Sequence, residues 1–145
     1  MSLRNTAAQL VQGAISLDAA SEAVRDAILG THTTSSGITG RVLRGTAVVE
    51  RDLSELAAYI SQYSMNDPEK WAGTFLMLHV QFAIDDVSAA VRMSKSVVQV
   101  SRGSCPKSAK AFALAIVDAV LARAGDLTPP EKELFRQARQ SFSQV

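Results

Sequence analysis

The sequence predicts an all-α protein, a compact bundle of five to six helices that forms a single domain over residues 1–145. Apolar residues recur at alternating steps of three and four along most of the chain, which is the spacing of a helix with one buried side. The alternation of strands and helices that marks an α/β protein is missing. With 145 residues, of which 47% are hydrophobic, the chain is long and apolar enough to bury a core.

The first helix is predicted within residues 5–29, where the apolar positions keep helical spacing. Gly30 follows as a stop, since glycine adopts the left-handed conformation at little cost. Gly13 weakens the middle of this stretch, so the helix can break near it. Residues 30–40, "GTHTTSSGITG", predict a loop because they are rich in glycine, serine and threonine.

A second helix is predicted from about Thr39 to Tyr63, where apolar residues alternate in steps of four and three. Gly45 lies inside this stretch. The competing interpretation makes residues 41–50, "RVLRGTAVVE", a short β-hairpin or strand, with the helix beginning near Glu50. We favour the helix.

The third helix has the strongest start signal in the chain, "NDPEKW". Asp67 can cap the free backbone amides, and Pro68 fits the first helical position. The pattern predicts a helix that runs to at least Met93 and is apolar on two sides. One side holds Trp71, Phe75, Leu78 and Phe82, and the other holds Leu76, Val80, Ile84 and Val87. Such a helix is either buried in the centre or uses one side for a partner.

Residues 87–102 keep the helical spacing, so we expect the helix to continue through them and to end at Gly103. The alternative is a β-hairpin at 96–101, because "VVQV" has β character. A further helix would then begin at Ser104 or Cys105, with Pro106 in its first position.

Two helices complete the predicted bundle. Residues 106–126, "PKSAKAFALAIVDAVLARAGD", carry one charge between Ala111 and Ala122, so we expect the most buried helix there, with Gly125 as its stop. Residues 127–142 open with Thr128 and Glu131 in the spacing of a capping box. The apolar positions that would dock this last helix are Leu134, Phe135, Ala138 and Phe142.

The sequence offers few groups for catalysis or metal binding, so we expect no enzyme, no cofactor and no metal. The chain contains two histidines and one cysteine, at none of the spacings typical of zinc sites. Cys105 is interpreted as a small buried or helix-start residue; at a helix start beside Lys107 its thiol pKa would fall. His79 and Asp86 share a helix face and could form a polar contact, although two solvated edges are the simpler interpretation.

The stretch from Arg92 to Lys110 holds five basic residues and no acid, whereas the net charge of the chain is only +1. On a helix, Arg92, Lys95 and Arg102 form one stripe, which Lys107 and Lys110 extend. This stripe could bind the phosphates of RNA or DNA, with Arg41 and Arg44 as a further anion site. The competing interpretation is a solvated face neutralised by acids of other helices, such as Asp18, Glu22 or Glu50. The stretch has no aromatic residue for base stacking.

Our leading hypothesis is therefore a non-enzymatic assembly or adaptor module that acts through protein–protein contacts and self-associates. The partner face would be Trp71, Phe75, Leu78 and Phe82, and the alternative function is nucleic-acid binding through the basic stretch. No window approaches about 18 consecutive apolar residues, so we expect no transmembrane helix and no membrane partner. A single cysteine fits a reducing compartment, which favours a cytoplasmic protein; a viral protein, or one exported without a cleavable signal, would look the same.

Overall fold

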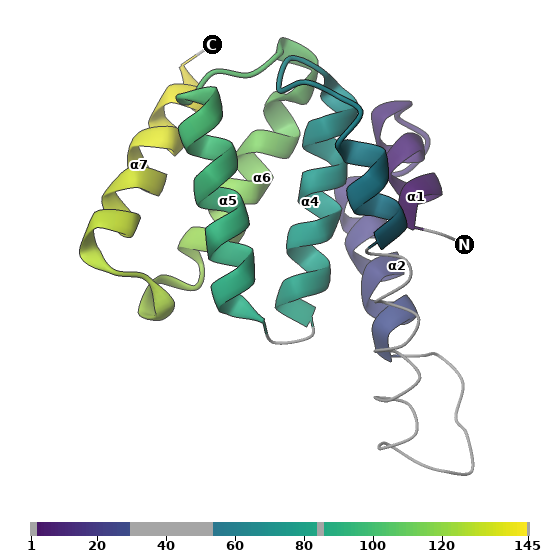
Figure 1. Cartoon of the computed structure of the whole chain (residues 1–145), viewed down its shortest axis with the longest axis horizontal. Coiled ribbons are helices and arrows are strands. Elements are labelled where there is room, and N and C mark those ends of the chain that lie inside the picture. Colours follow the sequence, from purple (N-terminus) through teal and green to yellow (C-terminus); the bar gives the residue numbers. More distant parts are fainter. Residues whose placement is uncertain (1–2, 30–53, 84–85, 145) are drawn as a thin grey trace.

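We analysed a computed structural model, which describes residues 3–29, 54–83 and 86–144 (Figure 1). Every regular element in these residues is helical, which confirms the all-α class. The labelled α-helices are α1 (Leu3–Val11), α2 (Leu17–Leu29), α4 (Pro68–Ala83), α5 (Val87–Ser101), α6 (Lys110–Leu121) and α7 (Pro129–Ser143). A further helix spans 54–60, and two short 3₁₀ turns are η1 (Lys107–Ala109) and η2 (Ala124–Asp126).

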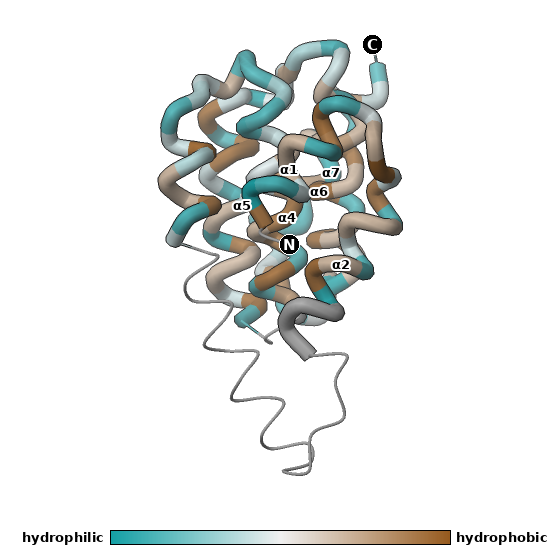
Figure 2. Tube along the Cα trace, turned by 90° about the vertical axis from the view of Figure 1, so that its right-hand side faces the viewer, coloured by the Kyte–Doolittle hydropathy of each residue, from teal (hydrophilic) through white to brown (hydrophobic). Residues whose placement is uncertain are grey.

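α4 occupies the centre of the bundle. It contacts α1 and α2 on one side and α5 and α6 on the other, while α7 packs on α5 and α6 (Figure 1). Along each helix, hydrophobic and hydrophilic residues alternate, as Figure 2 shows. This is the pattern of amphipathic helices that share one core.

The described residues contain more α-helices than predicted, because two predicted helices are each divided in two. The expected break at Gly13 is confirmed: Gly13 has a φ of 75°, and Ser16 Oγ accepts a hydrogen bond from the Ala19 amide at 3.1 Å. The serine therefore caps the start of α2. The predicted loop at 30–40 and the predicted hairpin at 41–50 lie outside the described residues.

The predicted continuous helix from Asp67 to Met93 is wrong at one place. α4 ends at Ala83, and Asp86 starts α5 with non-helical φ and ψ of −98° and 65°. Its Oδ1 accepts a hydrogen bond from the Ala89 amide at 3.3 Å. A short carboxylate competes for backbone amides and so favours a new helix start over continuation. The helical spacing of apolar residues continues on both sides of the break, so the spacing alone gave no sign of it.

The alternative hairpin at 96–101 is wrong, because these residues form the last turns of α5. Val98 and Ser101 are buried there, so tertiary packing overrides the β preference of "VVQV". Arg102 then closes the helix with a φ of 52°, its amide donating to Val98 O at 2.8 Å. Gly103, with a φ of 78°, follows the helix end as expected.

The starts of the last two helices differ in how well the sequence predicted them. Pro106 is extended and precedes η1, and α6 begins only at Lys110, so the predicted start with Pro106 in the first position is wrong. Gly125 lies in η2, beyond the end of α6, and is not its stop. The capping box of α7 is confirmed: the Glu131 amide donates to Thr128 Oγ1 at 3.4 Å, and the Thr128 amide donates to Glu131 Oε1 at 3.0 Å.

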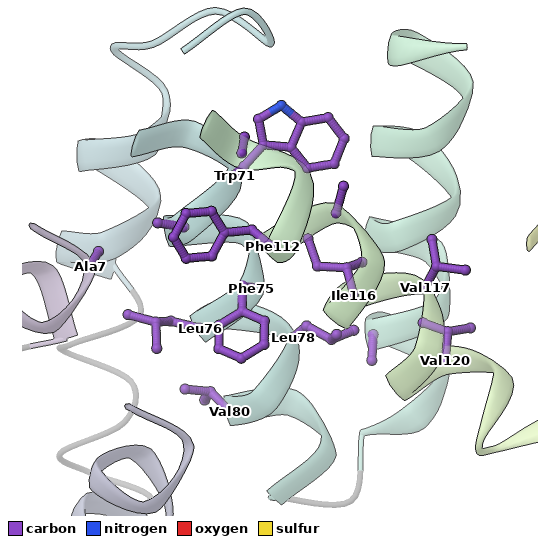
Figure 3. Close-up of a cluster of buried hydrophobic side chains, with 14 of the residues drawn as sticks. Ala7, Trp71, Phe75, Leu76, Leu78, Val80, Phe112, Ile116, Val117 and Val120 are labelled. Carbon is purple, nitrogen blue, oxygen red and sulfur yellow. The ribbon is translucent and has the colours of Figure 1, made fainter. Parts of the chain in front are cut away.

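The most buried helix is α4 and not α6 as predicted. None of the residues from Pro68 to Phe82 is exposed, because α4 has neighbours on both sides. Figure 3 shows Phe75 and Leu78 of α4 together with Ile116 and Val117 of α6 in the core. On the other side, the helix at 54–60 approaches so closely that a Cβ at Gly73 would lie 1.9 Å from Ile60 Cγ2.

Candidate binding seam between α5 and α7

The predicted partner face on α4 is not a surface. Trp71, Phe75 and Leu78 are buried within the chain, and only Phe82 is partly accessible. The Trp71 indole Nε1–H donates to Met65 O at 2.8 Å, and its ring meets Phe142 of α7 edge-on at 5.6 Å. The expectation that these residues contact a partner is therefore corrected: this side of α4 is covered by α6 and α7 of the same chain.

The predicted basic stripe divides into two groups, one within α5 and one beyond its end. In the first group, Arg92 lines a hollow of about 240 Å³ together with Asp126 and Glu131. Hydrogen bonds from Thr128 hold the pKa of Glu131 below its usual range, and the positive charge of Lys95 acts in the same direction. Acids from another part of the bundle thus face Arg92 and Lys95. The competing interpretation anticipated this, although it named acids other than Asp126 and Glu131.

The second group gathers at the corner where α5 ends. Arg102 lines a hollow of about 290 Å³, while Lys107 and Lys110 line a smaller one of about 90 Å³ beside Cys105. Gly103 and Ser141 belong to both hollows. Among the described residues, none of those that line these two hollows is a carboxylate. Arg41 and Arg44, the further predicted anion site, lie outside the described residues.

We name the space between α5 and α7 the α5–α7 seam; it comprises the 240 Å³ and 290 Å³ hollows. Residues early in α5 face Glu131, and residues late in α5 face Ser141, so the two helices run in the same direction. From Val87 to Arg102 the seam is about 22 Å long at 1.5 Å per helical residue. This length corresponds to about seven residues of an extended chain.

The larger hollow has an apolar floor and a polar rim. Val98 and Ala138 are buried at its base, and Leu134 is partly buried. Gln99, Gln137 and Ser141 are exposed around it. Arg102 is the one ionisable side chain among the described residues that line it. Apolar walls with a few polar groups are typical of binding sites.

The backbone at the end of the seam is constrained. Arg102 adopts the left-handed conformation, which is costly for any residue with a Cβ. A Cβ at Gly103 would lie 2.8 Å from Ser141 Cβ, so the corner packs directly on α7. A left-handed residue is common at a helix C-terminus, so the backbone here reflects the end of α5.

Two other predicted groups have different surroundings from those expected. Cys105 is half-buried, and burial raises its thiol pKa more than Lys110 lowers it, so the expected fall in pKa is wrong. Asp86 is exposed and caps α5, whereas His79 lies on the Phe75 ring with 4.4 Å between ring centres. The polar contact considered between His79 and Asp86 required a continuous helix, and α5 begins anew at Asp86; the favoured interpretation of two solvated edges holds for Asp86, which is exposed, and not for His79, which is partly buried.

The sequence interpretation missed one polar cluster. The Tyr59 hydroxyl donates to the Glu69 carboxylate, the Tyr63 ring meets that of Tyr59 edge-on at 5.2 Å, and the Arg4 guanidinium lies 5.0 Å above the Tyr59 ring. The tyrosine hydrogen bonds hold the pKa of Glu69 below its usual range. The spacing of Tyr59 and Tyr63, one helical turn apart, was the available signal. The cluster fixes α1 and the helix at 54–60 to the start of α4.

Within the described ranges, no three histidine, cysteine or acidic side chains gather where they could hold a metal ion. None of the described helices has both the length and the apolar character needed to cross a membrane. Comparisons of the chain with protein-family models, curated proteins and solved structures found no match.

Proposed function

We propose that the chain is a non-enzymatic adaptor that binds a short acidic segment of a partner protein in the α5–α7 seam. The observation that carries this proposal is the lining of the larger hollow. It has an apolar floor, two glutamine side chains on its rim and one cation, Arg102. The floor suits an aliphatic side chain of the partner, and the amide of Gln99 suits its backbone. The Gln137 side-chain amide already donates to Glu133 Oε1 at 3.1 Å, so its carbonyl oxygen is the group it offers. The proposal assigns no catalytic role.

The chemistry of the partner follows from Arg102. A guanidinium at the end of an apolar groove pairs with a carboxylate, which it can hold with two parallel hydrogen bonds. At the other end of the seam, Asp126 and Glu131 would favour a neutral or basic residue. We therefore expect the bound segment to place an acidic residue at Arg102 and an apolar side chain between Val98 and Ala138.

Selection from a phage-displayed library of random peptides tests the proposal. The full chain should select peptides that share one apolar and one acidic position. Arg102→Glu should lose these peptides, because the introduced carboxylate repels them, while Arg136→Glu serves as the matched control on an exposed part of α7. No common pattern, or equal binding by the Arg102→Glu variant, would contradict the proposal.

Self-association is one form that the protein–protein contact could take. Because Trp71 is buried, the side of α4 that was first expected to mediate self-association is not available. A segment of a second copy could still occupy the seam. Sedimentation velocity over a range of concentrations measures this directly. A concentration-dependent dimer that Arg102→Glu disrupts would identify the partner as a second copy, and a monomer at all concentrations would leave a different protein as the partner.

Nucleic-acid binding is the second candidate, and it rests on the three cations at the end of α5. Arg102, Lys107 and Lys110 line adjoining hollows with no described carboxylate among them. The acids beside Arg92 and the lack of aromatic side chains in the seam favour a peptide instead. Fluorescence anisotropy with labelled oligonucleotides tests this candidate. Affinity that falls steeply with salt, and that is lost when all three cations become Glu, would support it over the adaptor.

A further inference from the structure

Another hollow is lined by residues of α2 and α4. α2 lies on the opposite side of the bundle from α7 (Figure 1). The hollow has a volume of about 190 Å³ and is lined by Ser21, Val24, Arg25, His79 and Phe82. Val24 is buried at its base, and His79 is partly buried. This volume is comparable with that of a small ion and a few water molecules.

Two of the side chains that line this hollow are nitrogen bases, the Arg25 guanidinium and the His79 imidazole. Burial lowers the pKa of His79, and the positive charge of Arg25 acts in the same direction. The Arg123 guanidinium lies 5.2 Å from the centre of the Phe82 ring and 3.7 Å from Asp126. Ser21 is engaged, because its hydroxyl donates to Leu17 O at 3.0 Å.

The Arg25 guanidinium and the His79 imidazole line the same hollow, so an anion placed between them accepts N–H hydrogen bonds from both. We propose that this hollow, the Arg25–His79 pocket, binds a small oxyanion, a carboxylate or phosphate group, between the Arg25 guanidinium and the His79 imidazole. Arg25 supplies the permanent charge. His79 supplies a second N–H donor once it is protonated, and Phe82 shields one side of the pocket.

The proposal has a defined pH dependence. In the protein alone, burial and the positive charge of Arg25 lower the pKa of His79, so the imidazole stays neutral to a lower pH than an exposed histidine would. A bound anion reverses the effect of Arg25, because it attracts the imidazolium, so binding takes up a proton. Anion affinity should therefore rise as the pH falls through the His79 pKa. Among the described charged groups, Arg25 faces His79 from α2, Arg123 lies beyond Phe82, and Asp86 is engaged as the cap of α5.

NMR titration of the two histidine side chains tests this inference without knowledge of the natural ligand. The pH titration is repeated at constant ionic strength in sodium chloride, sodium acetate and sodium phosphate. The second histidine, His32, is the internal control, and a His32→Asn variant assigns the signals. We expect the His79 pKa to rise by about one unit in acetate or phosphate relative to chloride, which corresponds to about tenfold tighter binding to the protonated form.

A rise with acetate alone would assign a carboxylate ligand, and a rise with phosphate alone would assign a phosphate. Arg25→Gln should abolish the difference between salts, while Arg136→Gln, an exposed arginine on α7, should preserve it. The same pKa in all three salts, or equal shifts of His32 and His79, would overturn the proposal. A His79 pKa above its ordinary value in chloride would also overturn it, because a carboxylate of the chain itself would then face the ring.

Discussion

α4 and α5 are consecutive helices of 16 and 15 residues that pack side by side, yet they have opposite roles. No residue from Pro68 to Phe82 in α4 is exposed. α5 buries one side, including Ala90, Ser94 and Val98, and leaves Val100 67% exposed. Both helices show regular apolar spacing in the sequence, so spacing alone does not distinguish a core helix from a helix with one exposed side.

The difference lies in the number of neighbours. α4 is apolar on two sides and has helices on both, so its large aromatic residues form the core. α5 is apolar on one side, and its polar side borders the α5–α7 seam, where the exposed glutamines and Arg102 gather. The helix whose aromatic side looked most suited to a partner protein therefore buries Trp71, Phe75 and Leu78 of that side in the core. The predictions that follow test this contrast.

The largest effect should come from Trp71→Ala. Removing a fully buried tryptophan should lower the free energy of unfolding by about 3–5 kcal/mol. Val100→Ala on α5 is the contrast and should change it by less than about 0.5 kcal/mol, because Val100 is exposed. Urea unfolding followed by circular dichroism measures both. Trp71→Phe provides a milder variant should Trp71→Ala not fold, and similar values for positions 71 and 100 would refute the contrast.

Gly73→Ala should be the next most destabilising change, by about 1–3 kcal/mol, because the new Cβ would overlap Ile60 Cγ2. The sign of the change in unfolding free energy is informative, because alanine in place of glycine otherwise stabilises a helix by about 1 kcal/mol. Gly125→Ala is the control, because a Cβ there meets no atom within 4 Å. In an Ile60→Ala background Gly73→Ala should cost much less; an equal cost in both backgrounds would show that the contact is not responsible.

Asp86→Ala tests the break between the two helices. Loss of the side chain that caps the Ala89 amide should cost about 1 kcal/mol. Asp86→Asn keeps the acceptor oxygen and should cost much less. Thermal unfolding of the three proteins gives the comparison. If Asp86→Ala were as stable as the parent, or more so, a continuous helix would describe this region better than two.

Arg102→Gly should increase stability slightly, by about 0.5–1 kcal/mol, because glycine adopts the left-handed conformation without the Cβ penalty. The same change should abolish binding of the selected acidic peptides, since it removes the cation of the seam. Chemical unfolding and peptide binding are measured on the same sample. A more stable variant that still binds the peptides would separate Arg102 from the proposed function.

The smallest effect concerns the first turn of α4. Because hydrogen bonds from the tyrosines lower the pKa of Glu69, its stabilising contribution is present above the ordinary value of about 4.3 and is lost as the pH falls through the lowered pKa. Glu69→Gln should therefore reduce the loss of stability on acidification. Tyr59→Phe, which keeps the ring and removes the hydroxyl, should remove the same part of the pH dependence. Unchanged curves for both variants would contradict this assignment.

Local signals predicted the helix starts well where a side chain makes the cap. Asp67 and the Thr128–Glu131 capping box were correct because each depends on residues within one turn. The break at Asp86 was missed. An aspartate in this position can either cap a new helix or lie within a continuous one, and the sequence pattern fits both. The helix start predicted at Pro106 was wrong for a similar reason, because a proline is equally suited to an extended position such as the one before η1.

The candidate site was less predictable than the helices. The excess of cations between Arg92 and Lys110 is visible in the sequence, but the acids that face Arg92 come from Asp126 and Glu131, more than 30 residues away in the chain. The seam itself requires α5 and α7 to lie side by side, which no local pattern specifies. The closeness of Arg25 to His79 was not predicted either, because the two residues belong to α2 and α4, which a long segment of the chain separates.

The most direct test of the central claim is one ¹H–¹⁵N NMR titration of the chain with the tightest peptide from the selection. Trp71 is the only tryptophan, so its indole N–H gives a single signal, from the core at the start of α4. We expect the amide signals of residues 98–103 and 134–141 to shift on peptide binding and the indole signal to stay where it is. A shift of the Trp71 indole signal with no change along the α5–α7 seam would contradict it.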